Sequence, residues 1–466
     1  MVSLIKKVIE IEREKENKLK EEACKISIKE GSAYSISEGF GLRYITPYAL
    51  ALGAKNTHIG LLNSIPSLIG SFSSLSGVHL MKEVSRKKIV TMGVFIQALM
   101  WLALIGIGVL YFVLRIDSDI SPLLVIITYS LLVIFGAVTG PAWNSWMKDI
   151  IPEKYGRYFG IRNRICGSVS LLSMLVAGFI LDYFKKTNLF IGFIILFGFA
   201  FVGRSVSAYF FTKKYDPKFK AENHEHLTFL SFLRKISKNN FGKFTLFQSI
   251  MMFSVGIASP FFAVYMLKDL KFTYLMFTAI TMISLIVRLL VLPAWGRFTD
   301  KYGDVRAMKI TGVLIPLVPL FWLLVPIIIK INPILVFPYL LVTETISGLA
   351  WAGFDTGSGN FVFDSSNREN MPMFTAYYMI LANIGNFIGA LLGGILSSIS
   401  FTVFGLSSIL FVFLLSGVAR LITSFSMLPK LKEAKAVKKF DATDAKRIIF
   451  PVRKLTAEKS LALLLG

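Results

Sequence analysis

Five charged residues stand in stretches of this sequence that are otherwise apolar: Glu38, Arg43, Arg288, Glu344 and Asp355. A charge in an apolar helix costs several kcal/mol unless it is paired or hydrated, so such residues mark candidate binding sites. Loss of water favours the neutral form of a carboxyl group, which would let Glu344 or Glu38 bind and release a proton. A static ion pair with Arg288 or Arg43 and a direct contact with a bound solute are the alternatives, and Arg288 could hold an anionic solute.

Helical periodicity groups some of these residues with aromatic neighbours. In the apolar stretch 333–363, Glu344, Trp351 and Asp355 recur at the spacing of one helix face. In the stretch 31–53, Tyr34, Glu38 and Tyr48 also share a face. Arg43 would lie about 140° from Glu38 on the same helix, so we expect that the two side chains do not face one cavity squarely. The candidate substrate or proton site is therefore Tyr34, Glu38, Arg43, Tyr48, Arg288, Glu344, Trp351 and Asp355.

The composition places these residues in a membrane protein. Of 466 residues, 54% are hydrophobic, and the formal net charge is +23. A soluble globular protein could not bury so much apolar surface, so that class is excluded. Because about 20 apolar residues span a bilayer as a helix, the apolar blocks predict twelve spans. They lie at about 31–53, 58–80, 89–114, 122–148, 159–183, 188–212, 243–267, 273–295, 307–329, 333–363, 373–399 and 402–428.

The basic residues predict the orientation of the chain. With twelve spans, 40 of the 51 lysines and arginines fall on the side of the two termini, and seven fall on the opposite side. Positive charge is retained on the cytoplasmic side of a membrane, so both termini are expected there, in the cell membrane. The charge is thus a topological signal, and no nucleic-acid partner is expected.

The sequence also repeats in two halves. Gly77 to Gly93 and Gly296 to Gly312 both span sixteen positions. The pairs Asp149 with Arg204 and Asp364 with Arg420 recur in the two halves, and we expect them to be structural ion pairs. The predicted units are a charged N-terminal segment, a six-helix bundle, a central cytoplasmic loop, a second six-helix bundle and a basic cytoplasmic tail. Their boundaries are 1–30, 31–212, 213–242, 243–428 and 429–466.

One loop motif carries a family resemblance. Between the eighth and ninth predicted spans stand Gly296, Asp300, Lys301, Gly303 and Arg306. This stretch resembles the loop signature of the major facilitator superfamily. The copy in the first half departs from it, with Met81 and Val84 at the positions of the acid and the second glycine. The segment 143–149, followed by 156–160, is similar to the fourth loop of many prokaryotic members.

The resemblance implies an all-α membrane protein in which two pseudo-symmetric six-helix bundles form the major facilitator fold. It implies a secondary transporter that moves a small solute by alternating access, coupled to a proton or another solute, with the loop motif acting as a cytoplasmic gate. A uniporter, a lipid-like flippase and a transporter-like receptor without flux are the alternatives. The expected partners are a small-molecule substrate and the lipid bilayer. The protein is expected to be a monomer and not an enzyme, with no cofactor and no metal site.

Overall fold

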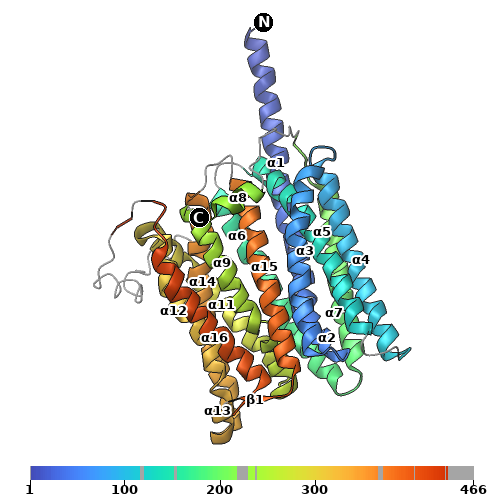
Figure 1. The fold of residues 1–466 in the computed structure, drawn as a ribbon. Helices are drawn as coiled ribbons and strands as arrows, with labels where there is room; N and C mark the ends of the chain where they lie inside the picture. The colour runs from blue at the N-terminus through green and yellow to red at the C-terminus, as the bar shows by residue number, and fades with distance from the viewer. Residues whose placement is uncertain are drawn as a thin grey trace, which may run out of the picture.

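The computed structural model describes residues 2–115, 120–151, 155–217, 229–236, 239–365, 371–403, 405–435 and 437–438. Long helices run side by side and form an elongated bundle (Figure 1). We call the end where α1 projects and α16 finishes the proximal end, and the opposite end the distal end. Among the described residues, ten helices are long and apolar enough to cross a membrane.

The described part of the N-terminal half consists of α-helices and a short 3₁₀ turn. They are α1 (Val2–Phe40), η1 (Leu42–Tyr44), α2 (Ile45–Ala51), α3 (Asn56–Leu80), α4 (Arg86–Phe112), α5 (Ile120–Ile150), α6 (Tyr155–Lys185) and α7 (Leu189–Lys213). The first two predicted spans correspond to α1 with α2, and to α3. These fall outside the ten apolar helices because α1 carries many charges and α3 is rich in serine.

The C-terminal half repeats this arrangement with more interruptions. Its helices are α9 (Asn240–Ala258), α10 (Phe261–Val264), α11 (Tyr274–Tyr302), α12 (Asp304–Trp322), α13 (Val325–Ile331), α14 (Val336–Asp364), α15 (Met371–Ser398) and α16 (Ser408–Met427). Short pieces join them: the π-helical turn η2 (Tyr265–Asp269) and the 3₁₀ turns η3 (Pro333–Leu335) and η4 (Leu428–Lys430). Strands β1 (Thr402–Val403) and β2 (Leu406–Ser407) pair antiparallel before α16. Helix α8 (Phe229–Lys235) lies between the two halves in sequence.

The charged N-terminal segment is not separate from the first span. Helix α1 runs without a break from Val2 to Phe40 and projects beyond the rest of the molecule (Figure 1). It ends at Phe40. The next residue, Gly41, packs tightly against Trp101 of α4, since a Cβ at Gly41 would lie 2.3 Å from the Trp101 ring. The missing side chain lets α1 approach α4 closely, and the chain then turns through η1 into α2.

The hydrophobic core differs between the two ends. At the distal end a single cluster joins both halves, with Tyr44 and Phe193 from one half and Phe261 and Phe277 from the other. At the proximal end the clusters of the two halves are separate. One surrounds Trp146 in the N-terminal half, and another surrounds Phe244 in the C-terminal half. The halves are therefore packed together distally and apart proximally.

Candidate functional site

Two ion pairs form between side chains inside the helical bundle, one in each half. Arg43 donates a hydrogen bond from Nη2 to Oε1 of Glu38 over 3.0 Å. Arg288 Nη2 of α11 lies 2.8 Å from Oδ2 of Asp355 on α14. Between 28% and 45% of each of these four side chains is exposed, which leaves the charged groups within reach of a solute or water.

The expectation that Glu38 and Arg43 point apart is wrong. It assumed a single helix through both residues, whereas α1 ends at Phe40 and η1 begins at Leu42. The break at Gly41 changes the direction of the chain by enough for the guanidinium group to turn back to the carboxylate. The alternative of an ion pair with Arg43 is thus the arrangement that the structure has.

Glu344 has no such ion pair among the described residues. Its carboxyl group lies near the side chains of Ser284, Trp322 and Ser347, and Arg420 is the cation that acts on it. Trp322 Nε1 is buried without a hydrogen-bond partner in the described part of the chain. Glu344 itself is partly exposed on α14. Among the described residues this carboxyl group therefore has polar neighbours but no ion-pair partner.

The aromatic candidates divide into two kinds. The Arg204 guanidinium lies 4.6 Å from the centre of the Tyr34 ring, which places Tyr34 between that cation and the Glu38 region. Trp351 is partly exposed and packs edge-on against Phe354. Tyr48 is different, because it is fully buried and its hydroxyl donates to the Leu104 carbonyl oxygen over 2.6 Å. The prediction of Tyr48 as a binding residue is therefore wrong: it packs inside its own half.

The predicted ion pairs Asp149 with Arg204 and Asp364 with Arg420 do not form. Arg86, the first residue of α4, lies 2.6 Å from Asp149 and 3.9 Å from Asp216. Lys435 Nζ lies 2.7 Å from Asp364 and 4.0 Å from Asp304. Both aspartates lie at the proximal ends of their helices, so a cation at the start of α4 and one in the segment after α16 reach them, while the two arginines are buried deeper in the bundle.

The two duplicated arginines make their hydrogen bonds to neutral groups, and Nε of Arg420 has no partner among the described residues. Arg204 donates to Oε1 of Gln97, from Nε over 3.0 Å and also from Nη2. Arg420 points to the carbonyl oxygens of Ile315 and Val255, both 3.4 Å away. Both arginines are buried. They therefore tie neighbouring helices of one half together, which agrees with a structural role but not with the predicted partners.

The loop motif of the C-terminal half is held by the chain that follows α16. Gly303 adopts a positive φ of 102°, which a residue with a side chain rarely adopts, and it ends α11. Glu433 accepts hydrogen bonds from the backbone N–H groups of Val305 and Arg306, each over 3.0 Å. Asp300 and Lys301 are exposed on the last turn of α11. Gly296 has open space around it, because a Cβ there would meet no atom within 4 Å.

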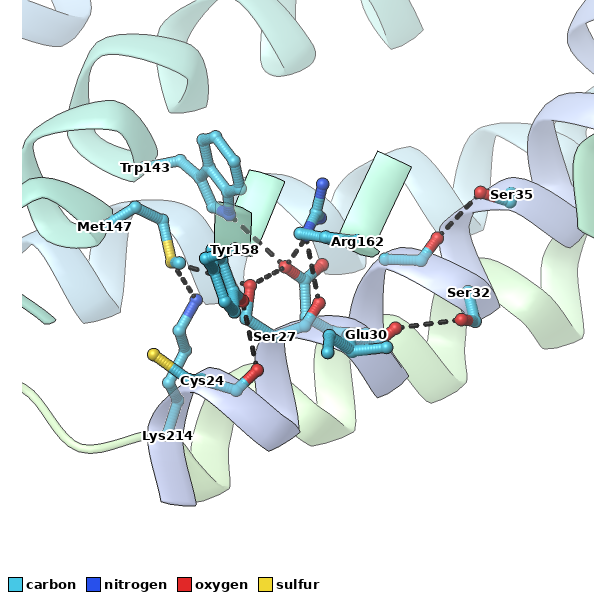
Figure 2. Close-up of polar contacts among 12 residues, drawn as sticks. Cys24, Ser27, Glu30, Ser32, Ser35, Trp143, Met147, Tyr158, Arg162 and Lys214 are labelled. Carbon is cyan, nitrogen blue, oxygen red and sulfur yellow. Dashed lines mark hydrogen bonds and ion pairs between the residues drawn. The ribbon is translucent and has the colours of Figure 1, made fainter. Parts of the chain in front are cut away.

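Sequence reasoning missed a buried polar cluster around Glu30, in the part of α1 that packs against α5 and α6 (Figure 2). Glu30 is 2% exposed, and its Oε1 accepts from Ser27 Oγ, Trp143 Nε1 and Arg162 Nη2 over 3.1–3.3 Å. Beside it, the fully buried Lys214 amine lies 2.8 Å from Met147 Sδ. Burial lowers the pKa of Lys214 to about 8, while the Glu30 carboxylate acts to raise it. Glu30 was hidden within the charged segment 1–30, where nothing marks one carboxylate as buried.

Similarity to known proteins defines the class and then the family. The fold of two helical halves with apolar spans is that of a polytopic membrane protein. The sequence matches the model of the Major Facilitator Superfamily twice, over residues 35–254 and 244–465. The chain therefore belongs to the Major Facilitator Superfamily, and it is a membrane transporter of that type. Family and fold indicate a transporter rather than an enzyme.

Solved structures share this fold at low sequence identity. The nucleoside transporter NupG is 15% identical with a TM-score of 0.61, over 89% of this chain and 99% of that one. A bacterial homologue of the iron transporter ferroportin in its inward-facing state is 11% identical with a TM-score of 0.68, over 89% and 98%. In its outward-facing state the same homologue is 13% identical with a TM-score of 0.56, over 88% of this chain and 99% of that one. No curated protein sequence matches the chain.

Proposed function

We propose that this protein is a secondary transporter that moves a small charged or polar solute by alternating access. We also propose that the conformation described above is the inward-open one. The observation that carries this is the asymmetry of the core, which joins the halves at the distal end and leaves them separate at the proximal end. An access path closed at one end and open at the other is what alternating access requires.

The side to which the protein is open follows from the charges. The distribution of lysine and arginine predicts that the proximal end is cytoplasmic. Open space beside Gly140 of α5 and Gly359 of α14, both toward the proximal end, fits a cytoplasmic vestibule. The higher TM-score to the inward-facing than to the outward-facing ferroportin homologue is in line with the same state.

The solute site that we propose lies between the two ion pairs Glu38–Arg43 and Arg288–Asp355. Each pair offers one cation and one anion that remain partly exposed. A solute with a charged group can replace one partner of a pair, and the pair re-forms when the solute leaves. Glu344, which has no described ion-pair partner, is the proposed proton carrier, because its charge can change without disrupting either pair.

Reconstituted vesicles test this function once a solute has been found. A thermal-shift screen of the purified protein identifies a binding solute, since a ligand that binds only the folded state raises its stability. Counterflow of that labelled solute in proteoliposomes is then expected, and an imposed proton gradient should drive its accumulation. Binding without any flux would contradict the transporter and favour a receptor.

The coupling role is tested separately from transport. We expect Glu344→Gln to keep counterflow but to lose acceleration by a proton gradient, because the amide cannot carry a proton. Glu38→Gln breaks the pair with Arg43 and should weaken solute binding instead. If transport by Glu344→Gln keeps its full dependence on the proton gradient, the coupling proposal is wrong.

A further inference from the structure

A carboxylate of one half caps a helix of the other half at the distal end. Asp182, near the end of α6, accepts hydrogen bonds from the backbone N–H groups of Tyr274 over 2.7 Å and Leu275 over 2.8 Å. These are the first residues of α11, where N–H groups have no partner within the helix. A negative charge there is also favoured by the positive end of the helix dipole.

The internal repeat places a second cap at the equivalent position. Asp182 lies 22 residues before Arg204, and Ser398 lies 22 residues before Arg420. Ser398, the last residue of α15, accepts from the backbone N–H of Thr57 over 3.1 Å. Thr57 is the second residue of α3, so the end of one helix again caps the start of a helix in the opposite half.

The two caps differ in chemistry. The Asp182 carboxylate accepts two backbone N–H groups with a full charge, whereas the Ser398 hydroxyl accepts one as a neutral group. Hydrogen bonds to a charged acceptor are roughly twice as strong as neutral ones. Both copies of the repeat therefore cap a helix of the opposite half, and the charged copy makes the stronger bonds to backbone N–H groups.

Other contacts between the halves surround the caps. Tyr44 bonds through its hydroxyl to Thr278 Oγ1 of the other half over 2.6 Å. Lys268 Nζ donates to the Ala54 carbonyl over 2.8 Å. The helices are also in close contact, because a Cβ at Gly178 of α6 would lie 2.8 Å from Thr278. All of these contacts join the distal ends.

We propose that Asp182 and Ser398 form a distal clasp that holds the extracellular side closed, and that Asp182 supplies the larger part of it. The clasp rests on the proposed alternating access, since both caps must be released before the distal ends can separate. Release leaves the first N–H groups of α11 and α3 exposed to water at the opened entrance. The balance between inward-open and outward-open states is then set by the strength of the caps.

Distances between spin labels across the distal end test the clasp. Cys24 and Cys166 are replaced by serine, and labels are attached at cysteines introduced at Val113 and Ile334, both strongly exposed. We expect Asp182→Asn to raise the population with a long distal distance by about tenfold or more relative to the labelled parent, because charge-assisted bonds are lost. Asp182→Ser, which copies the cap of the other half, should give a rise of similar size, because its hydroxyl is also a neutral acceptor, and it serves as a second variant in case Asp182→Asn misfolds.

Two controls make the result specific. Ser398→Ala should shift the population in the same direction by a smaller factor. Asp269→Asn removes the same charge from the same end and leaves both capping groups in place, so it should leave the distances unchanged. A distal distance in Asp182→Asn and Asp182→Ser that equals that of the parent or of Asp269→Asn would overturn the clasp. Absence of solute flux in vesicles would instead reject the transport function.

Discussion

At the scale of single residues, the charges within the helices divide by their partners. Arg204 and Arg420 are buried and bound to neutral groups within their own halves, whereas Glu38, Arg43, Arg288 and Asp355 form partly exposed pairs. The comparison of the two halves places the same residues in the same two groups in the sequence. It did not give the partners, because most of them belong to neighbouring helices and the sequence does not show which helix faces meet.

The first prediction concerns the partners of the two duplicated aspartates. Asp149→Asn should cost about 1–3 kcal/mol of stability, because it leaves the buried Arg86 guanidinium with weaker acceptors. Asp364→Asn should cost only about 0.2–1 kcal/mol, because Lys435 is 38% exposed and water screens the pair. Thermal unfolding in detergent measures both losses.

Double-mutant cycles provide the control for these losses. Asp149 should couple energetically to Arg86, and Asp364 to Lys435, since residues in contact are not additive. Coupling of either aspartate to Arg204 or Arg420 would contradict the partners described above.

The second prediction concerns the buried amine of Lys214. Its pKa of about 8 lies below the usual value for lysine, so the unfolded chain binds more protons than the folded one between pH 8 and about 10.4. The cost of burying the charge is present in full below pH 8 and disappears as the pH rises through this window. Lys214→Met should therefore raise stability at pH 7, by about 1–2 kcal/mol after loss of the contacts with the aromatic rings.

The matched control is Lys213→Met, because Lys213 is exposed on the last turn of α7. The gain from Lys214→Met should shrink between pH 8 and about pH 10.4, whereas Lys213→Met should show no such trend. A stability gain that does not change with pH would mean that packing, and not charge, is the cause.

At the scale of elements, the segment after α16 acts as a strap on its own half. Glu433 caps α12, Lys435 reaches Asp364, and Lys432 and Asn240 exchange two hydrogen bonds at the start of α9. The N-terminal half has a similar strap after α7, where Arg86 donates to the Pro217 carbonyl and Trp146 to the Tyr215 carbonyl. Over the residues that the structure describes, each strap thus fixes the helix ends of its own half.

The third prediction tests the strap of the C-terminal half. Glu433→Ala should lower stability by about 0.5–2 kcal/mol, the usual loss for removal of a helix cap. Glu433→Gln should lose less, because its amide oxygen still accepts one N–H group. Thermal unfolding measures both, with the exposed Glu14→Ala as control. Equal losses in Glu433→Ala and Glu14→Ala would show that the strap does not stabilise α12.

At the scale of the whole molecule, the apolar blocks and the internal repeat were enough to predict the fold of two helical halves. The positions of the spans agree with the helices, because a helix that spans a bilayer must be hydrophobic along its length and its sequence shows this directly. The break at Gly41 was not predicted, since it depends on Trp101 from α4, and the direction of Arg43 follows from that contact. The Glu30 cluster was likewise hidden, because only the packing of α1 on α5 and α6 shows which charge is buried.

The fourth prediction tests which side of the membrane is open. In a background without Cys24 and Cys166, cysteines at Gly140 and Gly359 should react with a membrane-impermeant thiol reagent added from the cytoplasmic side. A cysteine at Val113, exposed near the distal end of α4, should react from the extracellular side only. Reaction of the first two from outside would reverse the proposed orientation or state.

The projecting end of helix α1 makes a movement of the N-terminal half easy to detect. The helix is unbroken up to Phe40, and its part before Leu19 extends roughly 26 Å at 1.5 Å per residue (Figure 1). Any rotation of that half must therefore swing the tip through an arc that grows with this length, as the end of a lever arm does. A small tilt of the N-terminal half inside the membrane therefore becomes a large displacement of the charged end of α1 in the water beside it.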